Sequence, residues 1–324
     1  MNKYNFIERL LHNLCFNFKF INKSLFELEK IFYNKSFDIN KIQNQKHIFI
    51  SGLPRSGTTS ILNYIYSSNE YASLTYKNMP FLFSPNLTSK ININKELKNK
   101  LRAHNDRIEY NISSPEAFDE VFLNSYNYED LSYEFLNYIS IILKFYGKKK
   151  YLSKNNNNYK RINFLKKIFP LSIFLIPFRE PLQHANSLLN QHKNFIKIHN
   201  EDNFILKYMN FLGHYEFGKN HISWFKPKNY FNYSDINYWL EQWIKFYENI
   251  LNIYYEDMKN IKILSYDKLC ETEYLTLLNE YLDIDNNNFR SFTIVQKTVN
   301  ENYNKKLYSK AFKLYKKLDN LTKC

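Results

Sequence analysis

Short apolar runs alternate along this chain with segments whose apolar residues recur at helical spacing. The runs end near Ser51, Lys154, Phe178 and Ser265, and each is short enough to form one strand. A helical pattern follows every run, and strands that alternate with helices form parallel βαβ units. The pattern therefore predicts an α/β fold in which helices flank a central parallel sheet.

The same pattern divides the 324 residues into regions of a single domain, since no change of composition marks a second one. We interpret residues 1–45 as an N-terminal helical extension, 46–270 as the core and 271–324 as a C-terminal helical segment. Residues 81–150 and 196–240 interrupt the alternation, and we expect mostly helical insertions there. This length is ample for one large buried core.

The helical segments at the two ends of the chain each carry an apolar face. The first includes Leu10, Leu14 and Phe18, and we favour a helix packed on the domain edge over one that lies on a membrane. Peripheral membrane contact stays open. The apolar face of residues 304–319 consists of Leu307, Ala311, Leu314 and Leu318. Lysines cover its other side, so this segment is expected to dock on the core.

The charge of the chain favours anionic partners. Lys and Arg total 45 against 31 Asp and Glu, a net charge of +14, and net charge bears on association rather than on fold. A nucleic-acid-binding protein would concentrate its basic residues beside aromatic stacking sites, whereas the lysines here are scattered. We expect no nucleic-acid partner, although a non-catalytic protein that binds anions or nucleic acid stays as an alternative.

Cysteine content and hydropathy indicate a cytoplasmic protein. Cys15, Cys270 and Cys324 form an odd, widely spaced set, which suits neither a disulfide framework nor paired metal ligands. A reducing compartment fits such a set best. No apolar run approaches the ~18 residues of a membrane span, and the first residues show no secretory signal. We therefore expect no transmembrane segment and no metal requirement.

A glycine-bearing loop joins the first predicted strand to its helix. Gly52 and Gly57, two of only five glycines, lie in the segment Gly-Leu-Pro-Arg-Ser-Gly-Thr-Thr that ends at Thr59. Backbone N–H groups in such a turn and the positive end of the helix dipole form a cradle for phosphate. A Walker A loop has Lys after its last glycine, but Thr58 stands there and the cation, Arg55, lies earlier. A P-loop nucleotide kinase or NTPase is therefore a disfavoured alternative.

This loop resembles the 5'-phosphosulfate loop of sulfotransferases that use 3'-phosphoadenosine-5'-phosphosulfate (PAPS), in particular the bacterial type. The family's loop often reads Pro-Arg/Lys-Ser/Thr-Gly-Thr-Thr, and the matching residues here are Pro54, Arg55, Ser56, Gly57, Thr58 and Thr59. The resemblance implies a P-loop-like sulfotransferase fold and PAPS as the co-substrate. It also implies that Arg55 contacts the bridging oxygen of the phosphosulfate, while the last three residues hold the 5'-phosphate.

A second anchor must hold the 3'-phosphate that distinguishes PAPS from ordinary nucleotides. The family uses an Arg at a strand end and a Ser eight residues later, and here Arg179 follows an apolar run with Ser187 eight residues on. Arg offers planar, bidentate donors to phosphate, and Ser adds a hydroxyl donor. Glu180 replaces the family's usual Asp and keeps its charge. The resemblance therefore implies a 3'-phosphate site at these residues.

A tyrosine completes the donor site that the resemblance implies. The segment Ser265-Tyr-Asp-Lys-Leu269 resembles the family's Tyr-Glu-Asp-Leu segment, whose Tyr touches adenine, and this assigns adenine contact to Tyr266. Each of these segments follows a predicted parallel strand. Because ligands bind at the carboxyl ends of the strands in open α/β sheets, we expect the assigned residues to converge on one edge.

Sulfuryl transfer is an in-line displacement at sulfur, helped by a base on the acceptor and by cations on the leaving group. Arg55 is the predicted leaving-group cation. Lys154 opens a Lys-Asn-Asn-Asn-Asn run that resembles a segment of some bacterial sulfotransferases, which would let it reach the sulfuryl oxygens. A polar loop in an Asn-rich chain is an equally supported interpretation of the run.

The base is the least defined role in the sequence. His104 can exchange a proton near neutral pH, and Glu116 lies in a segment, Ser113–Phe118, that also resembles bacterial sulfotransferases. Both are candidates, although Glu116 would equally suit the dipole of a helix that starts there. Related bacterial sequences tend to carry an acid where Asn78 stands. An amide cannot accept the proton, so either the base lies elsewhere or the activity is altered.

The sequence defines the chemical identity of the acceptor less precisely than that of the donor. Any hydroxyl or amine satisfies the chemistry. We favour a glycan or glycolipid, because aromatic faces pack on sugars and 18% of the residues are aromatic, with many in the basic insertions.

Overall fold

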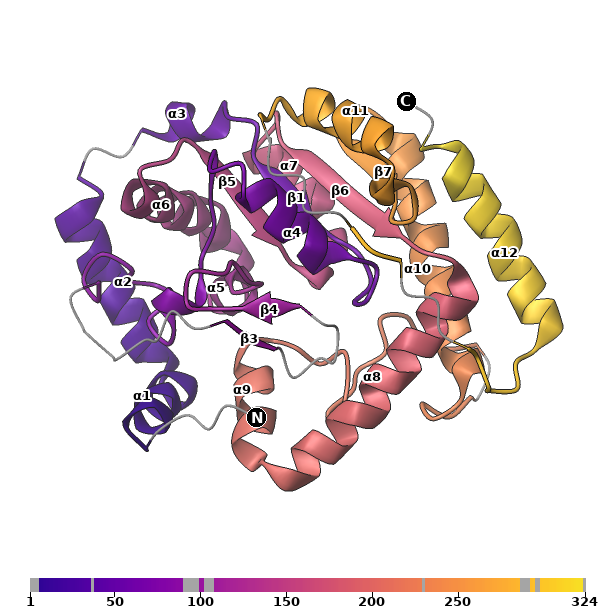
Figure 1. Cartoon of the computed structure of the whole chain (residues 1–324). Helices are drawn as coiled ribbons and strands as arrows, with labels where there is room; N and C mark the ends of the chain where they lie inside the picture. The colour runs from indigo at the N-terminus through magenta and orange to yellow at the C-terminus, as the bar shows by residue number, and fades with distance from the viewer. Residues whose placement is uncertain are drawn as a thin grey trace.

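A five-stranded parallel sheet forms the centre of the protein (Figure 1). The structure is a computed structural model that describes residues 6–35, 38–89, 99–101, 108–228, 231–285, 292–294 and 298–322. Along the sheet the strand order is β2-β5-β1-β6-β7, and every neighbouring pair is parallel. The strands are β1 (Ile48–Ile50), β2 (Tyr71–Ala72), β5 (Lys150–Lys154), β6 (Ile173–Phe178) and β7 (Ile261–Ser265).

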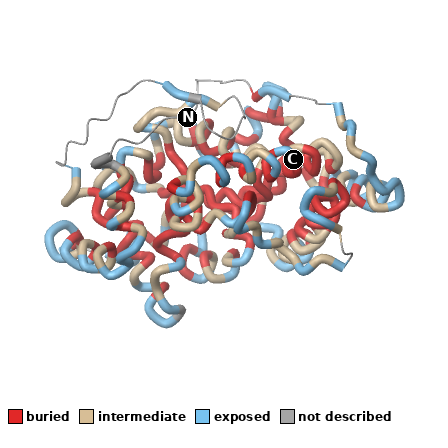
Figure 2. The backbone as a smooth tube through the Cα atoms, turned by 90° about the horizontal axis from the view of Figure 1, so that it is seen from below, coloured by how far each residue is buried: buried red, intermediate tan, exposed pale blue. Residues whose placement is uncertain are grey.

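Helices bury both faces of this sheet. In β1, Ile48 and Ile50 belong to one buried cluster and Phe49, between them, belongs to the other, as alternation along a strand requires. Helices α4 (Thr58–Tyr66) and α11 (Thr272–Leu282) pack on the first face. On the second face lie α6 (Tyr128–Tyr146), α7 (Ile162–Ile168) and α10 (Ile236–Glu256). Figure 2 shows buried residues through the middle of the molecule. The predicted α/β architecture is confirmed, and its near-continuous apolar strands suit a sheet covered on both sides.

The N-terminal extension is helical, as predicted, and it reaches the core. Its helices are α1 (Phe6–Asn17), α2 (Lys19–Tyr33) and α3 (Ile39–Gln43). Phe26 of α2 is fully buried, and its ring meets that of Phe122 edge-on at 5.0 Å between centroids. Glu29, also fully buried, accepts hydrogen bonds from the backbone N–H groups of Asn86 and Leu87. Phe26 therefore belongs to the same buried cluster as the sheet's Phe49.

The first insertion combines helices with a small ribbon. It contains the short helix α5 (Asp119–Leu123), the long helix α6 and an antiparallel pair formed by β3 (Lys100–Leu101) and β4 (Glu109–Tyr110). A 3₁₀ turn, η1 (Tyr76–Asn78), precedes the insertion.

The second insertion, residues 196–240, is helical at its two ends. Helices α8 (Pro181–Glu201), which begins with Pro181, and α9 (Asn203–Phe211) cover it up to residue 211, and α10 begins at Ile236. Residues 212–228 and 231–235 form turns without a helix. Gly213 and Gly218 adopt φ of 73° and 84°, a left-handed geometry that interrupts a helix. The expectation of a mostly helical insertion is therefore wrong for residues 212–228 and 231–235.

The remaining elements follow the predicted pattern with one difference. The helical pattern after the run that ends near Lys154 is split into a 3₁₀ turn, η2 (Asn156–Lys160), and α7, because the Asn155 side chain accepts the N–H of Asn157 and tightens the first turn. A third 3₁₀ turn, η3 (Lys268–Cys270), follows β7. The docking helix is confirmed as α12 (Lys305–Asn320), whose Ala311 and Leu318 are fully buried. Within the described ranges, no helix is long and apolar enough to cross a bilayer.

Replacement of Phe26 by Ala tests whether the extension is an integral part of the fold. We expect the free energy of unfolding, measured by urea denaturation, to fall by about 3–5 kcal/mol because a large buried side chain leaves a cavity. Phe20 on the same helix is 66% exposed, so Phe20→Ala is the matched control and should change it by less than about 0.5 kcal/mol. Equal, small effects of both variants would contradict this role of α2.

Candidate active site

The predicted site residues lie at the carboxyl ends of four neighbouring strands. Lys154 ends β5, the glycine-bearing loop follows β1, Arg179 follows β6 and Tyr266 follows β7. The strand order β5-β1-β6-β7 places Lys154 on one side of the loop and Tyr266 on the other. Open α/β sheets bind ligands at this edge. Lys154, the loop, Arg179 and Tyr266 thus lie along one edge of the sheet, as expected.

The loop between β1 and α4 turns through two residues with positive φ. Arg55 has a φ of 70° and Gly57 a φ of 98°. A Cβ on Gly57 would lie 2.1 Å from a carbon of the Tyr266 ring, so the ring occupies space that only glycine leaves open. Helix α4 begins with Thr58 and Thr59, and the first N–H groups of a helix have no acceptor within it. The loop therefore offers donors and a positive helix end to an anion.

Two hydrogen bonds fix this loop from inside the protein. His184 of α8 is fully buried, and its Nε2 lies 2.8 Å from the carbonyl oxygen of Pro54. Burial lowers the pKa of His184 to about 3, so the ring is neutral and donates from Nε2 to the carbonyl. The hydroxyl of buried Ser56 donates to the Leu53 carbonyl at 2.7 Å. No sequence pattern indicated His184, because its partner lies 130 residues away.

The two predicted phosphate anchors contact each other. The Arg55 Nε donates to the Ser187 hydroxyl at 3.2 Å, and the Arg179 Nη1 donates to the Arg55 carbonyl at 3.2 Å. The Arg179 guanidinium carbon lies 5.4 Å from the centre of the Tyr266 ring, within cation–π range. Two guanidinium groups, a hydroxyl and a helix N-terminus thus surround one part of the sheet edge.

A cavity of about 270 Å³ opens beside Arg179. Its lining consists of Arg179, Glu180, Leu182, Gln183, Asp267, Ile294 and Tyr308. Tyr308 of α12 donates to a Glu180 oxygen at 3.0 Å, while the other oxygen accepts the N–H of Gln183 and caps α8. The C-terminal helix therefore closes one side of the cavity.

Two predicted catalytic residues meet on the opposite side of the loop. The Lys154 Nζ lies 3.1 Å from a Glu116 carboxylate oxygen, and each side chain is 7% exposed. The same carboxylate accepts hydrogen bonds from the Ala117 N–H at 2.9 Å and the Tyr76 hydroxyl at 3.1 Å. Because both carboxylate oxygens have donors, Glu116 is poorly placed to take a proton. Its contacts hold Lys154 beside β1, where Lys154 pairs with Ile50.

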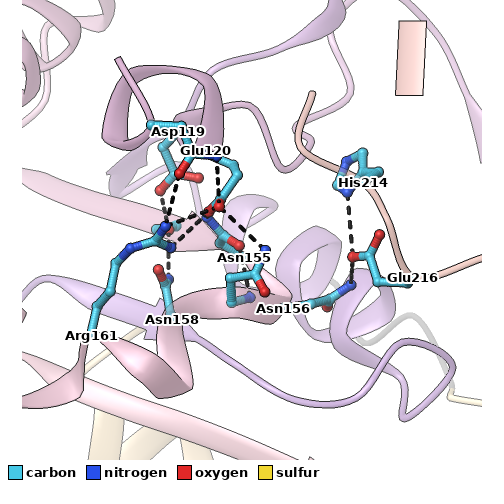
Figure 3. A network of polar contacts seen from close by, with 11 residues as sticks. Asp119, Glu120, Asn155, Asn156, Asn158, Arg161, His214 and Glu216 are labelled. Carbon is cyan, nitrogen blue, oxygen red and sulfur yellow. Dashed lines mark hydrogen bonds and ion pairs between the residues drawn. The ribbon is translucent and has the colours of Figure 1, made fainter. Parts of the chain in front are cut away.

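The first two asparagines after Lys154 donate hydrogen bonds to buried acids, as Figure 3 shows. Asn155 donates to Glu120 at 2.6 Å, and Asn156 donates to Glu216 at 3.0 Å. Arg161 adds a bidentate ion pair to Glu120 at 2.7 and 2.9 Å. The run is therefore part of an ordered polar network rather than a solvated loop.

His214 is a candidate residue that the sequence reasoning missed. Its Nδ1 lies 3.4 Å from the Glu216 oxygen that also accepts Asn156 (Figure 3). Burial alone would lower the pKa of His214, but the Glu216 carboxylate raises it overall. The same pairing outweighs burial at Glu216 and lowers its pKa to about 2. The rarity of glycine could have marked this loop, because Gly213 directly precedes His214.

Asn78 stands where related bacterial sequences tend to carry an acid, and its side chain is engaged in the structure. The Asn78 side-chain oxygen accepts hydrogen bonds from the Thr75 N–H at 2.9 Å and the Tyr146 hydroxyl at 2.7 Å. Asn78 therefore closes the turn η1 and anchors it to α6. His104 lies outside the described residues, and its role stays a prediction. Within the part of the chain that the structure covers, no group of three or more His, Cys, Asp or Glu could hold a metal ion.

Solved structures with a similar fold include bacterial sulfotransferases of low sequence identity. Sulfotransferase STF1 from Mycobacterium tuberculosis H37Rv aligns with a TM-score of 0.50 and 10% identity over 81% of this chain and 73% of that one. Sulfotransferase STF9 from Mycobacterium avium gives 0.46 and 11% over 91% and 77%. The sulfotransferase domain from the curacin biosynthetic pathway gives 0.37 and 12% over 75% of each chain. At such identity the STF1 likeness shows the fold alone, and no curated protein matches the sequence.

The sequence itself carries the family assignment. Residues 47–275 match the model of the family described as "Sulfotransferase family". This range covers more than two thirds of the chain and contains the loop after β1, Arg179, the Lys154–Glu116 pair and Tyr266. The chain therefore belongs to the sulfotransferase family, whose members transfer sulfuryl groups.

Proposed function

We propose that this sulfotransferase takes its sulfuryl group from PAPS and transfers it to a hydroxyl or amine of an acceptor. The observation that carries the proposal is the contact between the loop after β1 and the second anchor, Arg179 and Ser187. PAPS presents a 5'-phosphosulfate and a 3'-phosphate from one ribose, so it needs two anion sites close together. A helix N-terminus and two arginines meet that need.

In this proposal the loop residues hold the 5' end of the donor. The cradle consists of Pro54, Arg55, Ser56, Gly57, Thr58 and Thr59, with Arg55 as the cation for the leaving group. Arg179 and Ser187 hold the 3'-phosphate, and the Tyr266 ring lies beside the adenine. Donor binding would exchange the Arg55–Ser187 hydrogen bond for contacts to the two anionic groups. Ser56 contributes by fixing the shape of the loop, since its hydroxyl donates a hydrogen bond to the Leu53 carbonyl.

Lys154 is proposed to stabilise charge on the sulfuryl oxygens during transfer. It lies next to the loop because Lys154 pairs with Ile50, the last residue of β1. Glu116 keeps this lysine extended through the 3.1 Å ion pair. A preorganised cation in a site with little water stabilises a transition state more than it would in bulk solvent. The role of Glu116 is thus to position Lys154.

The acceptor is proposed to be a glycan or a glycolipid. The irregular segment after α9 carries exposed aromatic rings, among them Tyr215 at 37% and Tyr233 at 43% exposure, and such rings stack on sugars. Contact with the lipid part of a glycolipid would suit α2, on which Phe20, Ile31 and Phe32 are 58–66% exposed. Amphipathic helices of this kind bind at membrane surfaces.

Calorimetric titration with 3',5'-bisphosphoadenosine tests the donor. We expect micromolar binding, weaker binding of ADP and ATP, and a roughly 10- to 100-fold loss in Arg179→Ala, since a hydrogen bond to a charged group contributes about 1.5–3 kcal/mol. Lys193→Ala, on α8 and 44% exposed, is the control for loss of one cation. Equal or tighter ATP binding, especially with magnesium, would favour a nucleotide kinase instead.

Replacement of Gly57 by Ala tests the cradle. The added Cβ meets the Tyr266 ring at 2.1 Å, so we expect bisphosphate binding to fall more than about tenfold as the loop or the ring shifts. Gly147 also has a positive φ, 62°, but nothing lies within 4 Å of its Cβ position. Gly147→Ala therefore isolates backbone strain and should leave binding intact. Normal binding by Gly57→Ala would count against this cradle.

An acceptor panel with labelled PAPS tests the acceptor class. We expect transfer to 4-nitrophenyl glycosides or to a glycolipid in detergent micelles, since exposed aromatic rings border the segment after α9. Transfer confined to small phenols or to a tyrosine peptide would contradict the glycan proposal while leaving the donor assignment intact.

A further inference from the structure

The order of the strands separates the donor side of the site from the side where an acceptor would enter. Arg179 and Tyr266, the groups proposed for the 3'-phosphate and the adenine, follow β6 and β7. Lys154 follows β5, on the other side of the loop. A donor held across β1, β6 and β7 therefore directs its sulfuryl group toward β5. Groups that act on the acceptor must lie near Lys154.

His214 is the histidine that the polar network connects to this position. Lys154 is followed two residues later by Asn156, whose amide donates to Glu216 at 3.0 Å, and Glu216 lies 3.4 Å from the His214 Nδ1. The His214 side chain is 21% exposed, whereas the Glu216 side chain is 8% exposed. One nitrogen of the imidazole thus lies beside a buried carboxylate, and the side chain as a whole is partly exposed.

We propose that His214 is the general base of this sulfotransferase, with Glu216 as the residue that positions it. This inference rests on the proposed PAPS-dependent function. The Glu216 carboxylate fixes the tautomer in which Nδ1 carries hydrogen, so that the Nε2 lone pair of the neutral ring is available to the acceptor. The Asn156 amide fixes the carboxylate in turn. In many enzymes a third group orients the base that activates the nucleophile.

The step balances without a further reactant. As the acceptor oxygen forms its bond to sulfur, its proton passes to the His214 Nε2. The bond from sulfur to the bridging oxygen breaks, and its electron pair stays on that oxygen of 3',5'-bisphosphoadenosine, next to Arg55. The protonated imidazole is stabilised by Glu216 and later releases its proton to solvent. No oxidant, reductant or metal enters this balance.

Glu116, the other candidate base on this side, already has hydrogen-bond donors on both carboxylate oxygens. Both Glu116 oxygens accept hydrogen bonds or an ion pair from Lys154, Tyr76 and Ala117. A proton transfer to Glu116 would therefore break the contacts that hold Lys154. His214 has no such conflict, because protonation strengthens its pairing with Glu216.

The charges around His214 set the expected pH dependence. Glu216 from its own loop and Glu116 from the segment before α5 raise its pKa, while burial and Lys154 of β5 lower it, and the net pKa is raised. Lys160 and His221 lie within electrostatic reach of Glu216. A base acts when it is deprotonated, so the rate should rise with pH and level off above the raised pKa. Glu216→Gln removes the dominant stabilising charge and should move this rise to lower pH.

Hydrolysis of PAPS tests the proposal without knowledge of the natural acceptor, because water then takes the acceptor's place. Release of 3',5'-bisphosphoadenosine is measured by chromatography over a pH series. We expect the wild-type protein to accelerate hydrolysis and His214→Asn to slow it by about 10²–10⁴-fold, with calorimetric binding of the bisphosphate unchanged. His12→Asn, which removes a buried histidine from α1, is the control and should keep both the rate and the pH profile.

Three results would overturn the assignment. They are an unchanged rate in His214→Asn, an equal loss in His12→Asn, and a wild-type protein that binds the bisphosphate but does not accelerate hydrolysis. A pH profile that Glu216→Gln leaves in place would remove Glu216 from its positioning role. Restoration of the His214→Ala rate by added imidazole would support a base over a structural role. Absence of bisphosphate binding would instead contradict the proposed function itself.

Discussion

The packing of the Tyr266 ring against the backbone of Gly57 is the constraint on which the rest of the site depends. It joins the loop after β1 to the end of β7, two strands away, and the Tyr266 N–H donates to the Phe178 carbonyl at the end of β6. Arg179 follows Phe178 directly and donates to the carbonyl of Arg55. One close contact that only glycine permits therefore sets both the shape of the loop after β1 and the position of Arg179.

The two sides of the sheet edge hold their polar groups differently. On the side of β6 and β7, Arg179 lies beside a cavity and the ring of Tyr266, and the carboxylates of Glu180 and Asp267 line the same cavity. On the side of β5, Glu116, Glu120 and Glu216 are buried, and each has a cation or an amide as partner. Buried charges need such partners to offset desolvation, and a satisfied network fixes geometry. The first side suits binding of a phosphate, and the second suits precise placement of Lys154 and His214.

Local patterns predicted much of this fold, because strand order and loop position follow from short segments. The strands after which the loop, Arg179 and Tyr266 lie, and the helix that docks through Ala311, were all readable from hydropathy and glycine placement. Contacts between distant residues were not. His184 carries no local signature, since its role depends on Pro54, 130 residues away. His214 follows a rare glycine in an irregular segment, but the link from its partner Glu216 to Asn156 spans 60 residues of the chain. That segment departs from the predicted helix because two glycines adopt left-handed geometry there.

The measurement that tests the central claim most directly is a crystal structure with 3',5'-bisphosphoadenosine bound. The account predicts the 5'-phosphate on the N–H groups around Gly57 and the 3'-phosphate between Arg179 and Ser187. It also predicts adenine beside Tyr266 and the open side of the 5'-phosphate facing Lys154. A nucleotide bound away from the carboxyl edge of the sheet, or one whose phosphates avoid both Arg55 and Arg179, would contradict it.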